Sequence, residues 1–246
     1  DPRIKIIITF LFVILIFFVK TYLGYGMVFL FLAAVIAISK IPPKYVLKGL
    51  KPLLFIIILT FILNVFFTSG ETVIWSLGRV KVTQEGLRQG IFMAFRLILL
   101  VTGTSMLTLT TSPIDLTDGI ESLLKPLKII RFPVHELAMM MTIALRFIPT
   151  LLEETDKIMK AQMARGADFE SGNIIQRAKA LVPLLVPLFI SAFRRADELA
   201  MAMEARCYRG GDNRTRMKVL KTHPRDYIAL LCTLVLMIII IWDSYL

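Results

Sequence analysis

Long apolar runs separated by short polar segments make up the first half of the chain. A helix needs about 20 apolar residues to cross a hydrocarbon core roughly 30 Å thick. Runs of nearly this length therefore predict four membrane-spanning helices. Because the first two runs are short, they form either a helical hairpin or a re-entrant pair that does not cross fully. The four runs cover residues 4–19, 27–38, 52–68 and about 91–110.

Prolines and lysines mark the segment between the second and third runs, residues 39–51. Pro42 and Pro43 stop the preceding helix, and residues 44–51 predict a short helix at the membrane interface. Short loops rich in Lys and Arg stay on the cytoplasmic side of a membrane. The loop is therefore expected in the cytoplasm, and so is the N-terminus, two crossings earlier. The lysines are Lys40, Lys44, Lys48 and Lys51.

A polar segment on the outer side, residues 69–83, precedes the fourth run. Its stretches 73–77 and 79–82 predict a small strand hairpin. Arg96 lies inside the fourth run, where a charged side chain is a functional candidate by default. Since Arg96 lies near the outer end of that run, extension of its side chain to the interface is the alternative. Small residues give this helix one side suited to close packing: Gly86, Gly90, Ala94 and Gly103.

The pattern changes after residue 111. Residues 112–115 predict a helix start, with Ser at the cap, Pro in the first turn and Asp beside it. This short helix runs to about Leu124, and an apolar run over 137–152 follows. That run contains Arg146 and Pro149, so it is not a clean span. It either packs against the inner side of the membrane domain or, alternatively, crosses the bilayer.

Two long helices with charged distal halves are expected next. The first continues the apolar run through residues 153–165, where Glu153, Glu154 and Asp156 precede lysines by three or four positions. Gly166 ends it. The second begins at Ile174, contains two prolines, Pro183 and Pro187, and is expected to end at Gly210 and Gly211.

A last apolar run, residues 227–242, completes the chain. The predicted fold class is an all-α polytopic membrane protein with about five transmembrane helices, two long cytoplasmic helices and a shorter helix before them. Residues 1–111 form a membrane domain of four spans. Residues 112–224 form a cytoplasmic domain, and residues 225–246 form a C-terminal transmembrane helix.

Composition supports a membrane protein and argues against a nucleic-acid partner. Of the 246 residues, 57% are hydrophobic, against about 45–50% in soluble domains, and the mean hydropathy is +0.74. The net charge is +11, but residues 112–226 carry 18 Lys or Arg against 14 Asp or Glu. This mixture is typical of a salt-bridged surface rather than of a polybasic arm.

Patterns for catalysis or metal binding are absent from the sequence. It has no phosphate-binding Gly-rich loop and no Cys or His pair at metal-ligand spacing. His135 and His223 are far apart, and Cys207 and Cys232 do not make a disulfide framework. No predicted span carries two acids, so neither a proton relay nor an ion path is expected. We therefore expect no enzyme activity, no metal and no cofactor in this chain.

The two long helices end alike, in Ala164–Arg165–Gly166 and Ala205–Arg206–Cys207. An Arg in the last turn of a helix is favoured by the negative end of the helix dipole, which is a purely structural role. The repetition favours a second interpretation. Small flanking residues would let each helix end enter a groove on another protein, where the guanidinium reaches a carboxylate.

Four short segments carry a resemblance to a known family. They are Thr-Thr-Ser-Pro at 110–113, Ala-Leu-Arg-Phe-Ile-Pro at 144–149, Ala-Gln-Met-Ala-Arg-Gly at 161–166 and Ala-Arg-Cys-Tyr-Arg-Gly-Gly at 205–211. The chain resembles, over nearly its whole length, the transmembrane T component of energy-coupling factor (ECF) transporters. This EcfT/CbiQ family belongs to bacterial ABC-type importers of vitamins and metal ions.

The resemblance implies that the two long helices are coupling helices whose X-Arg-X motifs dock into two ABC ATPase subunits, of the EcfA and EcfA' type. The motif residues are Ala164, Arg165 and Gly166, and Ala205, Arg206 and Cys207, where Cys207 stands in place of the usual glycine. The resemblance also implies a separate membrane S component that holds the substrate, and a location in the bacterial plasma membrane.

The implied function is the transmission of ATP hydrolysis to the S component for uptake of a vitamin or other micronutrient. A dedicated cobalt or nickel importer is the alternative within the family. A membrane scaffold without a transport cycle is the alternative outside it. Nothing in the sequence identifies the substrate or the residues that touch the S component.

Overall fold

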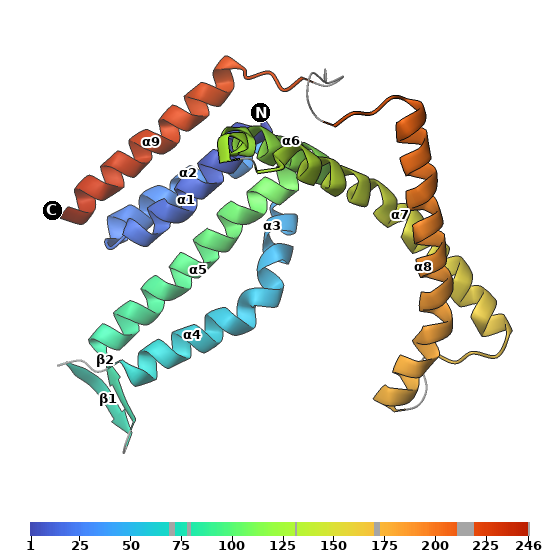
Figure 1. The fold of residues 1–246 in the computed structure, drawn as a ribbon. Coiled ribbons are helices and arrows are strands. Elements are labelled where there is room, and N and C mark those ends of the chain that lie inside the picture. The colour runs from blue at the N-terminus through green and yellow to red at the C-terminus, as the bar shows by residue number, and fades with distance from the viewer. Residues whose placement is uncertain (69–71, 78–79, 131, 170–172, 211–218, 246) are drawn as a thin grey trace. The chain divides into compact units, whose positions relative to one another are not determined.

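The computed structural model describes residues 1–68, 72–77, 80–130, 132–169, 173–210 and 219–245. Most of these residues lie in helices, whose order Figure 1 shows. In chain order the elements are α1 (Pro2–Phe18), α2 (Tyr22–Ser39), α3 (Pro43–Leu50), the 3-10 turn η1 (Lys51–Leu53), α4 (Leu54–Phe67), β1 (Val73–Leu77), β2 (Val80–Thr83), α5 (Gln84–Thr110), α6 (Pro113–Leu124), η2 (Lys125–Ile130), α7 (Val134–Ala164), α8 (Ile174–Ala205) and α9 (Pro224–Tyr245).

Six helical stretches of the described part are long and apolar enough to cross a membrane: α2, the stretch from α3 through α4, α5, α7, α8 and α9. The α1 helix has 17 residues, which corresponds to about 25 Å. These helices confirm the all-α polytopic membrane fold. Because α7 and α8 meet the same condition of length and composition, their expected place outside the bilayer stays a prediction.

Contacts divide the chain into two units. The first combines residues 1–120 with residues 220–246, and the second comprises residues 121–219. The C-terminal helix α9 belongs to the first unit because it packs against α1 and α2. The second unit contains α7 and α8, which pack against each other.

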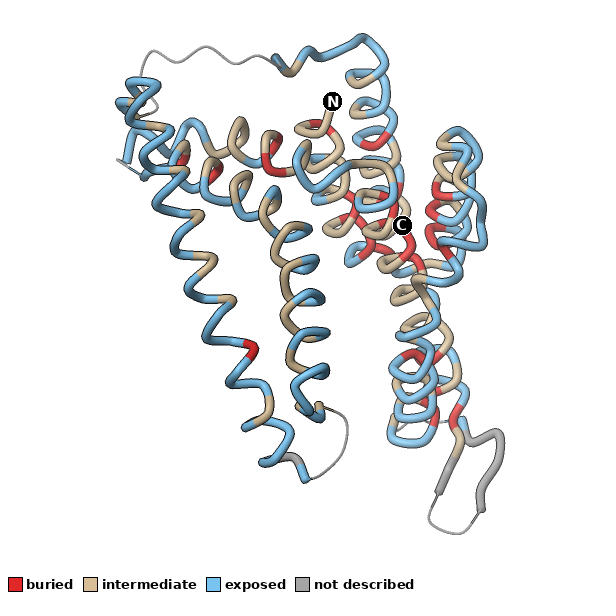
Figure 2. Tube along the Cα trace, turned by 90° about the vertical axis from the view of Figure 1, so that its right-hand side faces the viewer, coloured by how far each residue is buried: buried red, intermediate tan, exposed pale blue. Residues whose placement is uncertain are grey.

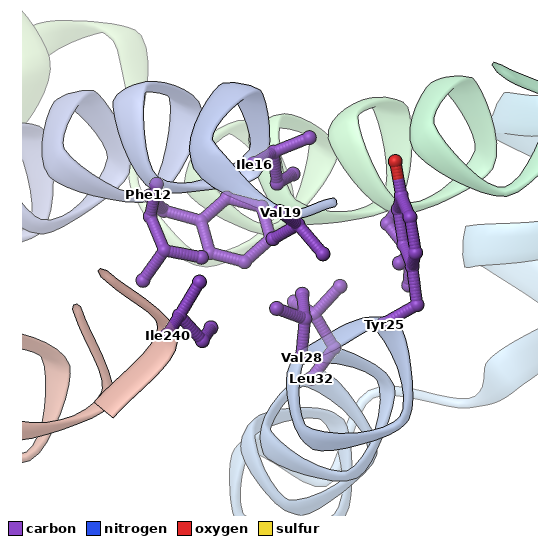
Figure 3. Packing of buried hydrophobic residues seen from close by; sticks show 9 residues of the cluster. Phe12, Ile16, Val19, Tyr25, Val28, Leu32 and Ile240 are labelled. Atoms are coloured by element: carbon purple, nitrogen blue, oxygen red, sulfur yellow. The ribbon is translucent and has the colours of Figure 1, made fainter. Parts of the chain in front are cut away.

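The first unit has a hydrophobic core where α1, α2, α5 and α9 meet. Figure 3 shows side chains of this cluster converging from helices that are far apart in the sequence. Much of the remaining apolar surface of this unit is exposed, as expected for helices that face lipid. The cluster consists of Phe12, Leu15, Ile16, Val19, Tyr25, Val28, Leu32, Leu99 and Ile240.

Three contacts at seven-residue intervals fix the antiparallel register of α1 against α5. Seven residues are two helix turns, so the contacts recur on one face of each helix. At the middle contact, a Cβ atom on Gly103 would lie 2.1 Å from Cε1 of Phe12, so only glycine fits beneath that ring. The three contacts join Lys5 to Thr110, Phe12 to Gly103 and Val19 to Arg96.

The outer two of these contacts place a cation at the C-terminal end of the opposite helix. Lys5 Nζ donates to the Thr110 carbonyl at 2.8 Å, and Arg96 Nη2 donates to the Val19 carbonyl at 3.3 Å. Carbonyls in the last turn of a helix have no partner within it and carry the negative end of its dipole. Arg96 therefore connects α5 to the end of α1, and its Nε also donates to the Tyr25 hydroxyl at 3.2 Å.

Close packing at the glycines of α5 is confirmed, but against two different helices rather than along one side, since Gly86 and Gly90 meet α4 and Gly103 meets α1. A Cβ at Gly86 would lie 3.1 Å from the Asn64 and Val65 carbonyl oxygens of α4. Gly90 is equally close to α4, at the Val65 side chain. The predicted hairpin is also present, as antiparallel β1 and β2, although residue 79 of the expected second strand lies outside the described residues.

Figure 2 shows that buried residues of the second unit are sparse along α7 and α8. Leu184 is the buried large apolar residue of the described part of α8. The predicted start of α8 at Ile174 is confirmed. The predicted end is wrong: α8 ends at Ala205, before Gly210, whereas Gly211 lies outside the described residues. The reason is that Cys207 itself adopts the left-handed conformation that is typical of glycine.

Candidate functional site

The end of α7 is a Schellman motif with Arg165 at the C-cap. The Arg165 N–H donates to the Gln162 carbonyl at 3.0 Å, the Gly166 N–H to the Met163 carbonyl at 2.9 Å, and the Ala167 N–H to the Gln162 carbonyl at 3.0 Å. Gly166 has φ +88°, the left-handed conformation that closes this motif. The guanidinium-bearing residue is thus the first one past the helix, immediately before the reversal of the chain.

The end of α8 repeats this geometry, with Arg206 at the equivalent place. The Arg206 N–H donates to the Met203 carbonyl at 3.2 Å, the Cys207 N–H to the Glu204 carbonyl at 2.8 Å, and the Tyr208 N–H to the Met203 carbonyl at 3.0 Å. Cys207 has φ +56°. Two sequences that share only Ala-Arg therefore build the same three-bond ending.

Cys207 is under backbone strain that Gly166 does not carry. A side chain in the left-handed region places Cβ too close to the carbonyl oxygen, at a cost of about 1–2 kcal/mol, whereas glycine adopts the region freely. The two hydrogen bonds of the motif, from Cys207 and Tyr208, offset that cost locally. The ending with Cys207 thus keeps the same shape as the ending with Gly166.

Both Arg residues and their small neighbours are exposed. Ala164, Arg165 and Gly166 are solvent-accessible, as are the three corresponding residues of α8. Within the part of the chain that the structure describes, no hydrogen bond or ion pair engages the guanidinium of Arg165 or that of Arg206. Each ending therefore presents a free cation on a surface without bulky neighbours at the adjacent positions. The three corresponding residues at the end of α8 are Ala205, Arg206 and Cys207.

A carboxylate on α7 connects the two helices that carry these endings. Glu154 accepts hydrogen bonds from the Ser191 hydroxyl through Oε1 and from Arg195 Nη2 through Oε2, the latter at 2.9 Å. Both partners lie on α8, one helix turn apart. From the sequence alone, Glu154 is expected to pair with a lysine three or four residues later in its own helix. Its carboxylate instead holds α8 against α7.

A second connection depends on the prolines of α8. Pro187 has no N–H, so the carbonyl of Pro183, four residues earlier, lacks its helical donor. Gln162 Nε2 of α7 approaches that carbonyl at 3.5 Å, a long hydrogen bond. The proline thus exposes a backbone acceptor that the neighbouring helix uses.

These two connections make α7 and α8 antiparallel where they cross, as Figure 1 shows. Moving along α7 from Glu154 to Gln162 corresponds to moving back along α8 from Arg195 to Pro183. The two Arg endings therefore point away from the crossing in opposite directions. At 1.5 Å per residue, they are separated by a distance on the order of 30 Å.

Sequence reasoning identified the two endings but missed the residues that hold the helices together. Glu154, Ser191, Arg195 and Gln162 are ordinary polar residues on charged helices. The missing N–H of Pro187 was a usable signal, because it leaves the Pro183 carbonyl available to a donor outside α8. Which residue of α7 supplies that donor depends on the register between the helices, and this cannot be obtained from either helix alone.

The described residues contain no group of three or more His, Cys, Asp or Glu that could hold a metal ion. His135 instead contacts Glu121 at the start of α7, with 3.1 Å between Nδ1 and Oε1. This contact connects the end of α6 to the start of α7 across η2. The second unit therefore consists of long helices that are held together by side-chain contacts and that end in exposed Arg residues.

The fold defines a polytopic helical membrane protein, and comparison with known proteins gives the family. The family model described as cobalt transport protein, CbiQ, matches residues 1–217. The chain belongs to the CbiQ/EcfT family of transmembrane components of energy-coupling factor transporters.

Curated relatives carry the name energy-coupling factor transporter transmembrane protein EcfT. The relative from Thermosediminibacter oceani is 64% identical over 233 residues, which cover 95% of this chain and 88% of the relative. The relative from Clostridium kluyveri is 60% identical over 97% of this chain and 89% of its own length. The relative from Bacillus subtilis is 51% identical over 96% of this chain and 89% of its own length.

Proposed function

We propose that the chain couples ATP hydrolysis by two cytoplasmic ABC ATPase subunits to a membrane S component that binds a vitamin or other micronutrient. One ATPase docks at Ala164–Arg165–Gly166 and the other at Ala205–Arg206–Cys207. The observation that carries this proposal is the repeated three-bond ending with an exposed, unengaged Arg. A helix-stabilising role alone requires neither the same backbone motif twice nor small neighbours on both sides.

The chemistry of each ending suits a groove with a carboxylate. A guanidinium forms two parallel hydrogen bonds to a carboxylate, and their strength grows when the pair is shielded from water. The small residues at the adjacent positions let the partner's backbone approach closely. Methionines before each ending, Met163 and Met203, supply polarisable apolar surface that adapts to a partner.

In the proposed assembly, residues 1–111 form a membrane domain, residues 112–224 a cytoplasmic coupling domain and residues 225–246 a further membrane helix. The N-terminus is cytoplasmic in the plasma membrane, since the lysine-rich loop 39–51 favours the inner side. ATP-driven approach of the two ATPases moves the two endings. The long helices pass this movement to the S component, which brings the substrate site that this chain is not proposed to contain.

A dedicated cobalt or nickel importer is the second candidate, because the matching family model carries the description cobalt transport protein. The two candidates share the ATPase docking and differ in the S component. Uptake of radiolabelled cobalt or nickel by cells that express the whole transporter decides between them. Metal uptake that requires this chain supports the second candidate, and its absence together with vitamin uptake supports the first.

The docking test is purification of the tagged chain from native membranes, followed by mass spectrometry of its partners. We expect Arg165→Glu and Arg206→Glu each to lower the recovery of one ATPase by about tenfold, since reversing one charge of a shielded pair leaves a carboxylate facing a carboxylate. Arg194→Glu, at another exposed arginine of α8, is the matched control and retains both ATPases.

Membrane insertion is measured in the same samples and is expected to be unchanged. Recovery of both ATPases and normal uptake in both mutants would reject the docking assignment. A set of partners without any ATPase would favour a scaffold. Activity of the purified chain alone on a small-molecule substrate would favour an enzyme.

A further inference from the structure

A small pocket lies in the first unit, where the α1–α2 turn faces α5. Its volume is about 220 Å³, below the roughly 300–1,000 Å³ typical of drug-sized ligands. Figure 3 shows Val19 at the end of α1 and Tyr25 at the start of α2, two of its walls. The complete lining is Val19, Lys20, Tyr25, Gln89, Phe92, Met93 and Arg96.

Three donor side chains of this lining retain hydrogen-bonding capacity. Arg96 uses Nε on Tyr25 and Nη2 on Val19, while its Nη1 has only a long 4.0 Å contact to the sulfur of Met93. Among the described residues, no hydrogen bond or ion pair involves the side chain of Lys20 or that of Gln89. The pocket therefore combines one weakly engaged nitrogen of a guanidinium with an ammonium and an amide whose side chains have no acceptor among the described residues.

The charge of the surroundings is positive. The lining contains no Asp or Glu, and Arg88 adds a further cation, 5.4 Å from the centre of the Phe92 ring. Two acids lie near the pocket but outside its lining, and each accepts from a neutral hydroxyl: Asp243 from Thr21, and Glu85 from Thr72 at 3.0 Å. Two cations that form no ion pair, in a lining without a carboxylate, favour an anionic ligand.

The position of the pocket narrows the class of anion. The turn at Lys20 and Thr21 joins two apolar helices, α1 and α2, and such turns lie at the level of lipid headgroups. The rings of Phe92 and Tyr25 stack with centroids 5.3 Å apart. They offer an apolar wall beside the cations, as expected for aromatic residues at a membrane interface.

We propose that this pocket binds the phosphate group of an anionic phospholipid headgroup, which Lys20, Gln89 and Arg96 hold against the Phe92 ring. The inference does not rest on the proposed coupling function. A bound lipid would connect α1, α2 and α5 at the end of the hydrophobic core. The same phosphate chemistry is offered by soluble phosphate, so the test includes both sources.

The test is native mass spectrometry of the purified chain after exchange into detergent with phosphatidylglycerol or phosphatidylcholine, and titration with inorganic phosphate. We expect one phosphatidylglycerol retained in preference to phosphatidylcholine. Lys20→Glu lowers this retention about tenfold, because it replaces an attractive charge by a repulsive one. Lys40→Glu, at an exposed lysine at the other end of α2, is the matched control and leaves it unchanged.

Gln89→Leu is a second variant, which keeps the net charge of the chain. We expect it to lower the retention of phosphatidylglycerol by a smaller factor than Lys20→Glu does. Arg96 is left intact, because it also holds the end of α1. Equal retention of both lipids by the unmodified chain, or unchanged retention in Lys20→Glu and Gln89→Leu, would overturn the proposal. Binding of inorganic phosphate with the same Lys20 dependence, in the absence of lipid retention, would overturn the lipid assignment and identify a site for soluble phosphate.

Discussion

Glu154 of α7 and Arg195 of α8 form a 2.9 Å ion pair across the crossing of the two longest helices. The carboxylate also accepts from Ser191, so three side chains fix how the helices cross. If the two Arg endings dock on separate ATPases, this crossing determines their separation. Its residues then affect coupling without touching a partner.

Glu154→Gln is expected to loosen the crossing, because the amide keeps the shape but loses the charge that holds Arg195. The pair is partly exposed, so we expect the melting temperature to fall by only a few degrees. Coupled uptake per ATP hydrolysed falls as well. The measurements are thermal unfolding in detergent and uptake in proteoliposomes containing the whole transporter.

Glu153→Gln is the matched control for Glu154→Gln. Glu153 is the preceding residue, is exposed, and its side chain has no hydrogen bond or ion pair within the described chain. The substitution Glu153→Gln is expected to leave both the melting temperature and the coupling unchanged. Equal effects of the two substitutions would show that the charge of α7, and not the contact with α8, matters.

Cys207→Gly is expected to stabilise the end of α8 by about 1 kcal/mol, since glycine adopts the left-handed conformation without a clash of Cβ. Gly166→Ala makes the opposite change at the end of α7 and costs a similar amount. Amide hydrogen exchange of the last turn of each helix measures both effects. Slower exchange after Gly166→Ala would contradict the left-handed assignment.

Gly103→Ala tests the packing of α1 on α5. Its methyl group would meet the Phe12 ring at 2.1 Å, so we expect destabilisation of about 1–3 kcal/mol. Phe12→Leu in the same chain restores part of this loss by opening space. Gly26→Ala is the matched control, because no atom lies within 4 Å of the position that its Cβ would take, and it is expected to be neutral or slightly stabilising. Unfolding monitored in detergent distinguishes these outcomes.

Gln162→Leu and Pro187→Ala form a double-mutant test of the second connection. Gln162→Leu alone removes the α7 donor to the Pro183 carbonyl and is expected to destabilise the helix pair by at most about 0.5 kcal/mol, because the contact is long and exposed. In the Pro187→Ala background, the new N–H bonds that carbonyl within α8, so the cost of Gln162→Leu shrinks. Equal costs in both backgrounds would mean that the 3.5 Å contact contributes nothing.

Much of the fold could be predicted from the sequence because the bilayer imposes length and polarity on each span. The helix starts at Pro113 and Ile174 were predictable, since caps, prolines and composition act locally. The small-residue side of α5 was predicted, but the assignment of Gly103 to α1 and of Gly86 and Gly90 to α4 required the helices to be placed in space. Local sequence does not encode which neighbour fills a gap.

The role of Arg96 shows the same limit. From the sequence, a functional role and an interfacial position are alternatives, and the structure shows a third feature, a bond to the Val19 carbonyl at the end of α1. The end of α8 could not be placed correctly with glycine as the marker of helix termination. Cys207 fills that place, and only the backbone hydrogen bonds reveal it.

The two contacts that hold α7 against α8, from Glu154 and from Gln162, do not lie midway between the two Arg endings. Arg165 follows Gln162 by three residues and Glu154 by eleven, whereas Arg206 follows Arg195 by eleven and Pro183 by twenty-three. The crossing is therefore a pivot with a short arm on α7 and a long arm on α8. A rotation of one helix against the other would carry Arg206 about two and a half times as far as Arg165. If the two endings dock on separate ATPases, equal displacements of the endings would therefore turn the two helices through unequal angles, with the larger angle for the short arm on α7.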